Sequence, residues 1–275
     1  MLSNYMDNVA FCFIVKDGDK YLQNNIDRLI KFAKLNFKEY KFFYAENDSK
    51  DNTVNILKKY KKEYFNFNGE HLLLDGKHST ELCNYELEYN CKKRTRRLAY
   101  LRNIVLNMAK EWKECDFLLM LDMDFVDFDE NELYNMFNII RNNKNINGIF
   151  GMSVIKNKYW YDTGAIKPVE KLISIMNNEK LVKVQSAFSG FGLYRMKIIN
   201  DKNLEYNIKT NEIEHIDFNK KINNLYVYTL FKPNYNGFSY WILCYEYCMK
   251  YGNILFIILA IIVFILFINR SNVKN

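Results

Sequence analysis

The most informative segment of the chain is Phe117-Leu118-Leu119-Met120-Leu121-Asp122-Met123-Asp124. An unbroken apolar run followed by two carboxylates predicts a strand over residues 116–122 that is buried on both faces and ends in an acidic turn. Such strands are typical of parallel sheets, in which ligands bind beyond the carboxyl ends of the strands. Two carboxylates at that place suit Mg²⁺ or Mn²⁺ bridging to a diphosphate, although Asp-x-Asp is also common in acidic turns that precede a helix, here one beginning near Glu130.

The first half of the chain alternates between strand and helix patterns, which predicts an α/β fold with a mostly parallel central sheet flanked by helices. Short apolar runs indicate the strands, and apolar residues at helical spacing indicate the helices. The expected strands are residues 9–15, 41–45, 72–74 and 116–122, and the expected helices are residues 21–35, 54–64 and 94–112, with a long loop over residues 75–93. Later patterns are weaker and predict a strand at 149–155, a turn at 167–168 and a strand pair within 182–195.

A second acidic segment, Glu46-Asn47-Asp48-Ser49-Lys50-Asp51-Asn52-Thr53, follows the strand at residues 41–45. It carries N-cap candidates for the helix at 54–64. The carboxyl ends of parallel strands share one edge of a sheet, so the topology places Glu46 near Asp122 and Asp124.

Three segments, in this order, resemble the inverting GT-A glycosyltransferases, both the large family-two group and the cryptococcal capsule mannosyltransferase group. They are the acidic turn at 46–53, the helical segment Leu98-Ala99-Tyr100-Leu101-Arg102-Asn103 and residues 117–124. The resemblance covers about residues 8–130. It implies a GT-A, Rossmann-like fold, a nucleotide-sugar donor, and Mn²⁺ or Mg²⁺ as cofactor.

The resemblance also implies roles for donor-site residues. Glu46 would bind the base or ribose of the donor, with Asp48 in the same turn. Asp122 would approach the ribose or the metal, and Asp124 would ligate the metal. Arg102 would lie near the donor phosphates, where a guanidinium can bridge two oxygens. The alternative for Arg102 is a solvated helix residue, because residues 92–102 are broadly basic.

Further residues are expected on the acceptor side. Residues 189–195, with Gly190 and Gly192, resemble the glycine-containing segment that lines the sugar and acceptor site in this group, and the alternative is a bulge or tight turn. Asp162 is expected to add a polar group to the acceptor pocket.

The segment Glu214-His215-Ile216-Asp217 occupies the place where related enzymes carry an acidic catalytic base. Inverting transfer requires a carboxylate that takes the proton of the acceptor hydroxyl. Glu214 is the first candidate and Asp217 the alternative. His215 would complete the metal shell or bind phosphate, and a His beside the Glu departs from the common family-two pattern.

The C-terminal region predicts a membrane anchor. No charged residue interrupts residues 251–269, and Lys250 and Arg270 bracket this run. About 19 residues span roughly 28 Å as a helix, close to the thickness of the hydrocarbon core, and the alternative is a buried core helix. The N-terminus lacks the pattern of a signal peptide. We therefore expect a tail-anchored protein with a cytosolic catalytic domain (1–240), a juxtamembrane segment (241–253), a transmembrane helix (254–268) and a short tail (269–275).

Composition narrows the classes of function. The chain has 49% hydrophobic and 26% charged residues, which excludes disorder, and its net charge of +7 favours anionic partners. The basic cluster at 92–97 lacks interleaved aromatic residues, so a nucleic-acid partner is not expected. The predicted function is a metal-dependent hexosyl- or deoxyhexosyltransferase acting on a glycan, lipid-linked or protein hydroxyl. Two alternatives are a sugar-phosphate nucleotidyltransferase, which would need a glycine-rich loop after the first strand, and a non-catalytic membrane-anchored scaffold.

Overall fold

A computed structural model of the chain describes residues 7–74, 91–155, 159–160, 163–176, 179–209 and 212–235. The chain divides into two compact units, residues 1–236 and 237–275. The second unit lies outside the described residues, and so do the expected juxtamembrane segment, transmembrane helix and tail. Within the described ranges, no helix combines the length and the apolar character needed to span a bilayer.

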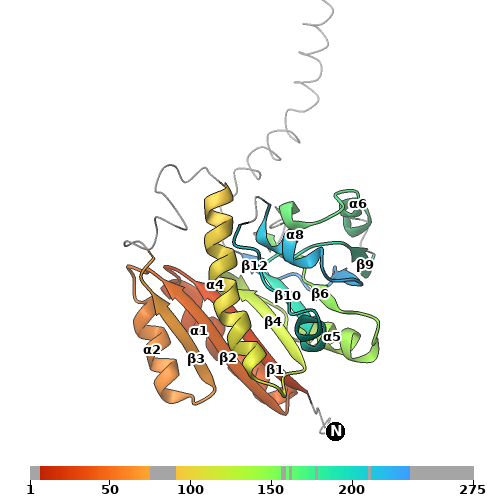
Figure 1. Ribbon diagram of the computed structural model, residues 1–275. Helices are drawn as coiled ribbons and strands as arrows, with labels where there is room; N and C mark the ends of the chain where they lie inside the picture. The colour runs from red at the N-terminus through yellow and green to blue at the C-terminus, as the bar shows by residue number, and fades with distance from the viewer. Residues whose placement is uncertain are drawn as a thin grey trace, which may run out of the picture. The chain divides into compact units, whose positions relative to one another are not determined.

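The first unit is built on an eight-stranded sheet in the order β3-β2-β1-β4-β10-β6-β11-β9 (Figure 1). Four strands from the first half of the chain run parallel: β1 (Asn8–Val15), β2 (Glu39–Asn47), β3 (Phe67–Leu72) and β4 (Phe117–Asp122). The other four are β6 (Gly148–Phe150), β9 (Leu181–Val184), β10 (Phe191–Arg195) and β11 (Leu225–Tyr228). Strand β10 is antiparallel to both β4 and β6, which makes the sheet mixed but mostly parallel.

Helices cover both faces of the parallel strands. Helix α4 (Cys91–Glu111) crosses one face over β1 and β2, and α1 (Asp19–Asn36) and α2 (Thr53–Glu63) cover the other (Figure 1). Helix α5 (Glu130–Asn142) packs near β6, and its N-cap Asp129 accepts hydrogen bonds from the amides of Asn131 and Glu132. The predicted α/β architecture of the first half is therefore confirmed.

Short elements complete the unit. A second sheet has the order β5-β12-β7-β8, and its strands are β5 (Phe125–Asp127), β12 (Asn234–Tyr235), β7 (Val154–Ile155) and β8 (Tyr159–Trp160). The remaining helices are a 3₁₀ turn (Thr163–Ala165), α6 (Lys171–Met176), α7 (Met196–Asp201) and α8 (Glu214–Asn219).

Side-chain alternation along the strands decides which residues face α4. Ala10, Cys12 and Ile14 of β1 belong to the core under α4, as do Phe43 and Ala45 of β2 and Leu118 and Met120 of β4. Because successive side chains on a strand point to opposite faces, Asn47 and Asp122 continue the α4 side. Glu46 falls on the opposite side, which α1 and α2 cover.

Three predicted elements are corrected by the structure. The third strand is Phe67–Leu72 rather than 72–74, because Phe67 packs against Phe42 and Tyr60 whereas Leu73 is exposed. The expected strand at 149–155 is divided between β6 and β7, which belong to different sheets. The expected pair within 182–195 does not form, because β6 and β11 lie between β9 and β10.

Candidate active site

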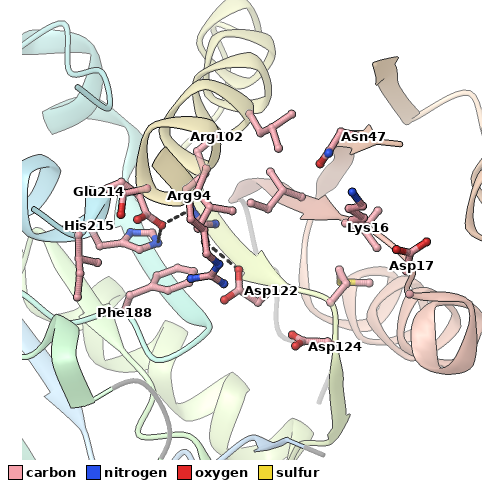
Figure 2. A pocket seen from close by; sticks show the side chains of 18 of the residues that line it. Lys16, Asp17, Asn47, Arg94, Arg102, Asp122, Asp124, Phe188, Glu214 and His215 are labelled. Atoms are coloured by element: carbon pink, nitrogen blue, oxygen red, sulfur yellow. Dashed lines mark hydrogen bonds and ion pairs between the residues drawn. The ribbon is translucent and has the colours of Figure 1, made fainter. Parts of the chain in front are cut away.

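A cavity of about 520 Å³ opens at the carboxyl ends of β1, β2 and β4, beneath the N-terminal half of α4. Figure 2 shows Phe188, Glu214 and His215 on one wall, Lys16, Asp17 and Asn47 on the opposite wall, and Arg102 and Asp122 between them. This is the place where ligands bind in open α/β sheets, as the sequence predicted. The α4 residues of the lining are Arg94, Thr95, Leu98, Leu101 and Arg102.

Arg102 lies at the centre of the cavity wall and is only 2% exposed. Its Nη2 donates a hydrogen bond to Asp122 Oδ1 at 2.8 Å, and its Nε donates to Glu214 Oε1 at 3.3 Å. The guanidinium lies 4.6 Å from the centre of the Phe188 ring. Burial alone would lower the pKa of Arg102, but the Asp122 and Glu214 carboxylates raise it above its ordinary value. Arg102 is therefore a buried, permanently charged bridge and not a solvated helix residue.

Asp122 ends β4, and Asp124 follows it after the buried Met123. Asn25 of α1, which is fully buried, fixes this turn: its Nδ2 donates hydrogen bonds to the carbonyls of Met123 at 3.0 Å and Phe125 at 2.7 Å. Partial desolvation in the cavity, and then the neighbouring Asp122 carboxylate, raise the pKa of Asp124 to about 6. The two carboxylates therefore repel each other, and a divalent cation would relieve that repulsion.

The donor set at this turn fits a hard cation. Mg²⁺ is commonly held by one or two carboxylates together with substrate phosphates, and Asp122 and Asp124 provide two. The described part of the chain contains no group of three or more His, Cys, Asp or Glu side chains that could hold a metal ion. The three predicted ligands Asp122, Asp124 and His215 are thus not gathered into one cluster, although all three line the cavity.

Glu214 and His215 begin α8, and both are buried, with 4% and 1% of their surface exposed. The His215 ring stacks on Phe188 at 3.5 Å between centroids and with 13° between planes. Its Nδ1 lies 3.3 Å from the hydroxyl of Tyr206, and its Nε2 lies 3.6 Å from Glu214 Oε1. Burial, and then the charge of Arg102, lower the pKa of His215 well below its ordinary value, so the ring is neutral. Asp217, the alternative base, is outside the lining and lies 3.9 Å from the Nζ of Lys221.

Glu46 and Asp48, two predicted donor-binding residues, are also outside the cavity lining. Glu46 has no exposed surface, and its carboxylate accepts a hydrogen bond from the Ser49 amide at 2.8 Å and contacts His71 Nδ1. Asp48 Oδ2 accepts from the Leu74 amide at 3.0 Å. The residue of this turn that does line the cavity is Asn47, which sequence reasoning missed. Strand alternation places Glu46 and Asn47 on opposite faces, but the packing of α4 decides which face borders the cavity.

The predicted acceptor-side glycines lie beside the cavity rather than in its lining. Gly190 has φ +77°, its carbonyl accepts a hydrogen bond from the Asp122 amide at 2.9 Å, and a Cβ there would overlap the Tyr235 hydroxyl. Gly192 lies within β10, between Met120 and Phe150. Gly190 therefore forms a tight turn, and the expected contact of both glycines with the acceptor stays a prediction. Asp162 lies outside the described residues.

Other lining residues follow β1 and were not predicted. They are Lys16, Asp17, Gly18, Lys20 and Tyr21. Hydrogen bonds tie this loop to the turn after β2, among them Gly18 N to Thr53 Oγ1 at 2.8 Å and Lys50 N to Asp17 Oδ1 at 2.7 Å. Ligands bind beyond the carboxyl ends of parallel strands, and this rule, which pointed to Glu46 and Asp122, applies equally to the residues that follow β1.

No protein-family model matches the chain, and no curated protein matches its sequence. Solved structures do resemble it. S. aureus TarS 1-349 superposes with a TM-score of 0.54 and 16% sequence identity, and the match covers 83% of this chain and 60% of the TarS chain. TarS 1-349 in complex with UDP-GlcNAc gives the same TM-score and identity, and that match covers 84% of this chain and 60% of the TarS chain. The mannosyltransferase PcManGT from Pyrobaculum calidifontis, in complex with GDP-Man and Mn²⁺, reaches a TM-score of 0.46 at 9% identity over 78% and 51%, too little for any argument.

This chain thus spans about three fifths of TarS 1-349. At such low identity the similarity establishes the fold alone, an α/β fold with a mixed, mostly parallel central sheet like that of the GT-A class.

Proposed function

We propose that the chain is a metal-dependent glycosyltransferase that moves a sugar from a nucleotide-sugar donor to a hydroxyl of a glycan, lipid or protein acceptor. The observation that carries the proposal is the gathering of Asp122, Asp124, Arg102 and Glu214 around one cavity at the carboxyl ends of parallel strands. The fold similarity to TarS, which has been solved with UDP-GlcNAc, supports it and makes UDP-GlcNAc the first donor to test. The resemblance to the cryptococcal capsule group stays a prediction.

The distribution of side chains along the cavity supports one orientation of the donor. The turn at 46–53, which the resemblance assigns to the nucleoside, reaches the cavity through Asn47, because Glu46 faces the other side of the sheet. The nucleoside would therefore lie at the β1–β2 end, near Asn47. The diphosphate would lie near Asp122 and Asp124, with the cationic Arg94 in the same lining. The sugar would then extend toward Glu214.

Asp122 and Asp124 would hold Mn²⁺ or Mg²⁺. The cation would supply charge neutralisation of the departing nucleoside diphosphate. Arg102 already neutralises part of the carboxylate charge at Asp122, which leaves Asp124 as the carboxylate with the stronger need of a cation.

Glu214 would act as the base. As the acceptor oxygen attacks the anomeric carbon, its proton passes to Glu214, and the bond from that carbon to the diphosphate breaks with its electron pair going to the diphosphate. Attack from the face opposite the diphosphate inverts the configuration at the anomeric carbon. Asp217 is the weaker candidate, because it lies outside the cavity lining.

Two further parts of the proposal concern location and alternatives. Membrane attachment through residues 254–268 rests on the apolar sequence of that segment, and the cytosolic location of the catalytic domain stays a prediction. A nucleotidyltransferase would release pyrophosphate instead of a nucleoside diphosphate, and a scaffold would bind without turnover. The loop after β1 contains one glycine in residues 16–20, which disfavours the nucleotidyltransferase.

The test uses the full chain in detergent with a panel of nucleotide sugars, beginning with UDP-GlcNAc, and with Mn²⁺, Mg²⁺ or EDTA. Release of nucleoside diphosphate is measured for the wild type, Asp124→Asn and Glu214→Gln. Asp127→Asn is the matched control, because Asp127 is an exposed carboxylate three residues further on that pairs with Arg28. We expect metal-dependent release from one donor, lost in the first two variants and kept in the control. Absence of release with every donor would contradict the proposal, and binding without release would favour the scaffold.

A further inference from the structure

A chain of buried polar contacts leads from Tyr206 through His215 to Glu214. Tyr206 is 2% exposed, and the one hydrogen-bond partner of its hydroxyl among the described residues is His215 Nδ1, at 3.3 Å. On the other side of the ring, His215 Nε2 is buried, lies 3.6 Å from Glu214 Oε1 and has no hydrogen-bond partner within the described ranges. The function proposed above assigns no task to Tyr206 or to this contact.

The tautomer of His215 follows from these contacts. If Nδ1 carried the hydrogen, the buried Tyr206 hydroxyl would have no acceptor for its proton, and the Nε2 lone pair would face a carboxylate oxygen. If Tyr206 donates to Nδ1, both problems vanish, because the hydroxyl is satisfied and the nitrogen that lies 3.6 Å from the Glu214 carboxylate carries a hydrogen instead of a lone pair. Donation from Tyr206 to Nδ1 avoids both an unsatisfied buried hydroxyl and a lone pair that faces a carboxylate oxygen, so His215 carries its hydrogen on Nε2.

Phe188 holds the ring in this plane. Its ring lies parallel to the imidazole, and the Arg102 guanidinium lies against the same Phe188 side chain. The hydrogen bond from Arg102 and the contact from His215 both reach Oε1 of Glu214. One oxygen of the carboxylate is thus occupied by the protein, which leaves Oε2 as the oxygen that can take a proton from a substrate.

We propose that Tyr206 and His215 are positioning residues that, together with Arg102, orient Glu214 so that Oε2 faces the acceptor hydroxyl. This inference rests on the proposed function for the role of Glu214 as base. It also assigns His215 a task other than metal binding, because a nitrogen that carries hydrogen has no lone pair for a cation. The neutral state of the buried ring agrees with this assignment.

The first test reads the tautomer directly and does not depend on any donor. Long-range ¹H–¹⁵N correlation spectra of the histidine rings are simple here, because the chain has three histidines. We expect the wild type to show His215 protonated at Nε2 only. Tyr206→Phe removes one of the two contacts that favour the Nε2–H tautomer while the Glu214 contact remains, so we expect it to raise the fraction of the Nδ1–H tautomer without making it the major form. Tyr194→Phe is the matched control, because Tyr194 is equally buried and its hydroxyl bonds Asn219 Oδ1 at 3.0 Å.

The second test reads the consequence for turnover. Tyr206→Phe is expected to lower kcat about 10-fold with little change in the donor KM, because a misplaced base slows the chemical step and not donor binding. Tyr194→Phe should leave both constants unchanged. His215→Gln, whose side-chain amide can still donate near the Nε2 position, should keep more activity than His215→Phe.

The two tests separate failure of the inference from failure of the proposed function. An Nε2 without hydrogen in the wild type overturns the inference, whether or not a donor is found. An active enzyme in which Tyr206→Phe changes neither the tautomer nor kcat overturns it as well. A wild type that shows the expected tautomer but turns over no donor would contradict the proposed function and with it the role of Glu214 as base, while the buried contact chain would stand.

Discussion

Replacement of Arg102 with methionine would leave two carboxylates at the cavity wall without the cation that they share. Methionine has a similar reach and can still pack against Phe188, so the change removes the charge, the hydrogen bonds and the cation–π contact with little loss of packing. The variant therefore measures the ion pairs together with that one cation–π contact.

The expected cost follows from the burial of each partner. The side chains of Arg102 and Glu214 are 3% and 5% exposed, and loss of one partner of a buried pair costs about 3–5 kcal/mol. The Asp122 side chain is 23% exposed, so water can partly replace its bond, and we add no more than about 1 kcal/mol for it. We expect the free energy of unfolding to fall by about 3–6 kcal/mol, which for a unit of this size corresponds to a Tm lower by roughly 6–24 °C.

Urea unfolding followed by far-UV circular dichroism measures this difference. Arg28→Met is the matched control, because Arg28 also bridges two carboxylates, Asp127 at 2.6 Å and Glu130 at 2.7 Å, but at a more exposed place. The control should cost about 1 kcal/mol. The double variant Arg102→Met/Glu214→Gln should recover about 2 kcal/mol, because it removes the stranded charge. If Arg102→Met costs no more than Arg28→Met, or if the double variant recovers nothing, the buried ion-pair reasoning is wrong.

Three further predictions concern other residues. Asp124 has a pKa of about 6 in the fold against 3.8 as the ordinary value, so its ionisation opposes folding, and stability is lost as pH rises through that interval. The side chain is exposed, so solvent screening reduces the energy of this shift, and Asp124→Asn should gain about 1 kcal/mol at pH 7.5 without divalent cations and nothing at pH 3.5. Urea unfolding measures this difference, and a loss at pH 7.5 would refute the prediction. Gly190→Ala should lower the free energy of unfolding by about 2–4 kcal/mol in the same assay, because φ is +77° and the new Cβ would overlap the Tyr235 hydroxyl. A decrease below about 1 kcal/mol would contradict this geometry. Burial raises the pKa of Cys115 to about 12, so iodoacetamide at pH 8 should label this thiol only after unfolding. Peptide mapping measures the labelling, and labelling of Cys115 in the folded protein would count against the prediction.

The location of the candidate site could be predicted from local patterns. The apolar run that ends at Asp122 identifies a strand buried on both faces, and the alternation of strands and helices before it implies a parallel sheet. These features depend on the spacing of apolar residues and on the residues that end each element, and both are local properties of the sequence. The carboxyl edge of the strands, and with it the Asp122–Asp124 turn, followed from them.

The identity of the residue that reaches the cavity after β2 was harder to predict. Glu46 and Asn47 are adjacent, and either is a plausible polar contact, but successive side chains on a strand face opposite sides of the sheet. The sequence contains this alternation, yet it does not say which side α4 covers. The packing of α4 on the face of Ala45 decided that Asn47 lines the cavity and that Glu46 lies beneath the other face.

The sequence by itself determined the elements of the first half except the position of β3, together with the carboxyl edge of the sheet and the acidic turn at that edge, because these depend on periodicity and strand ends. Only the tertiary structure decided that Arg102 joins Asp122, 20 residues away, to Glu214, 112 residues away, and that Tyr206 reaches His215 behind them. The later strands β6, β9, β10 and β11 are short, and their order in the sheet is set by contacts between distant segments. Contacts of that kind depend on how whole elements pack, and no local pattern encodes them.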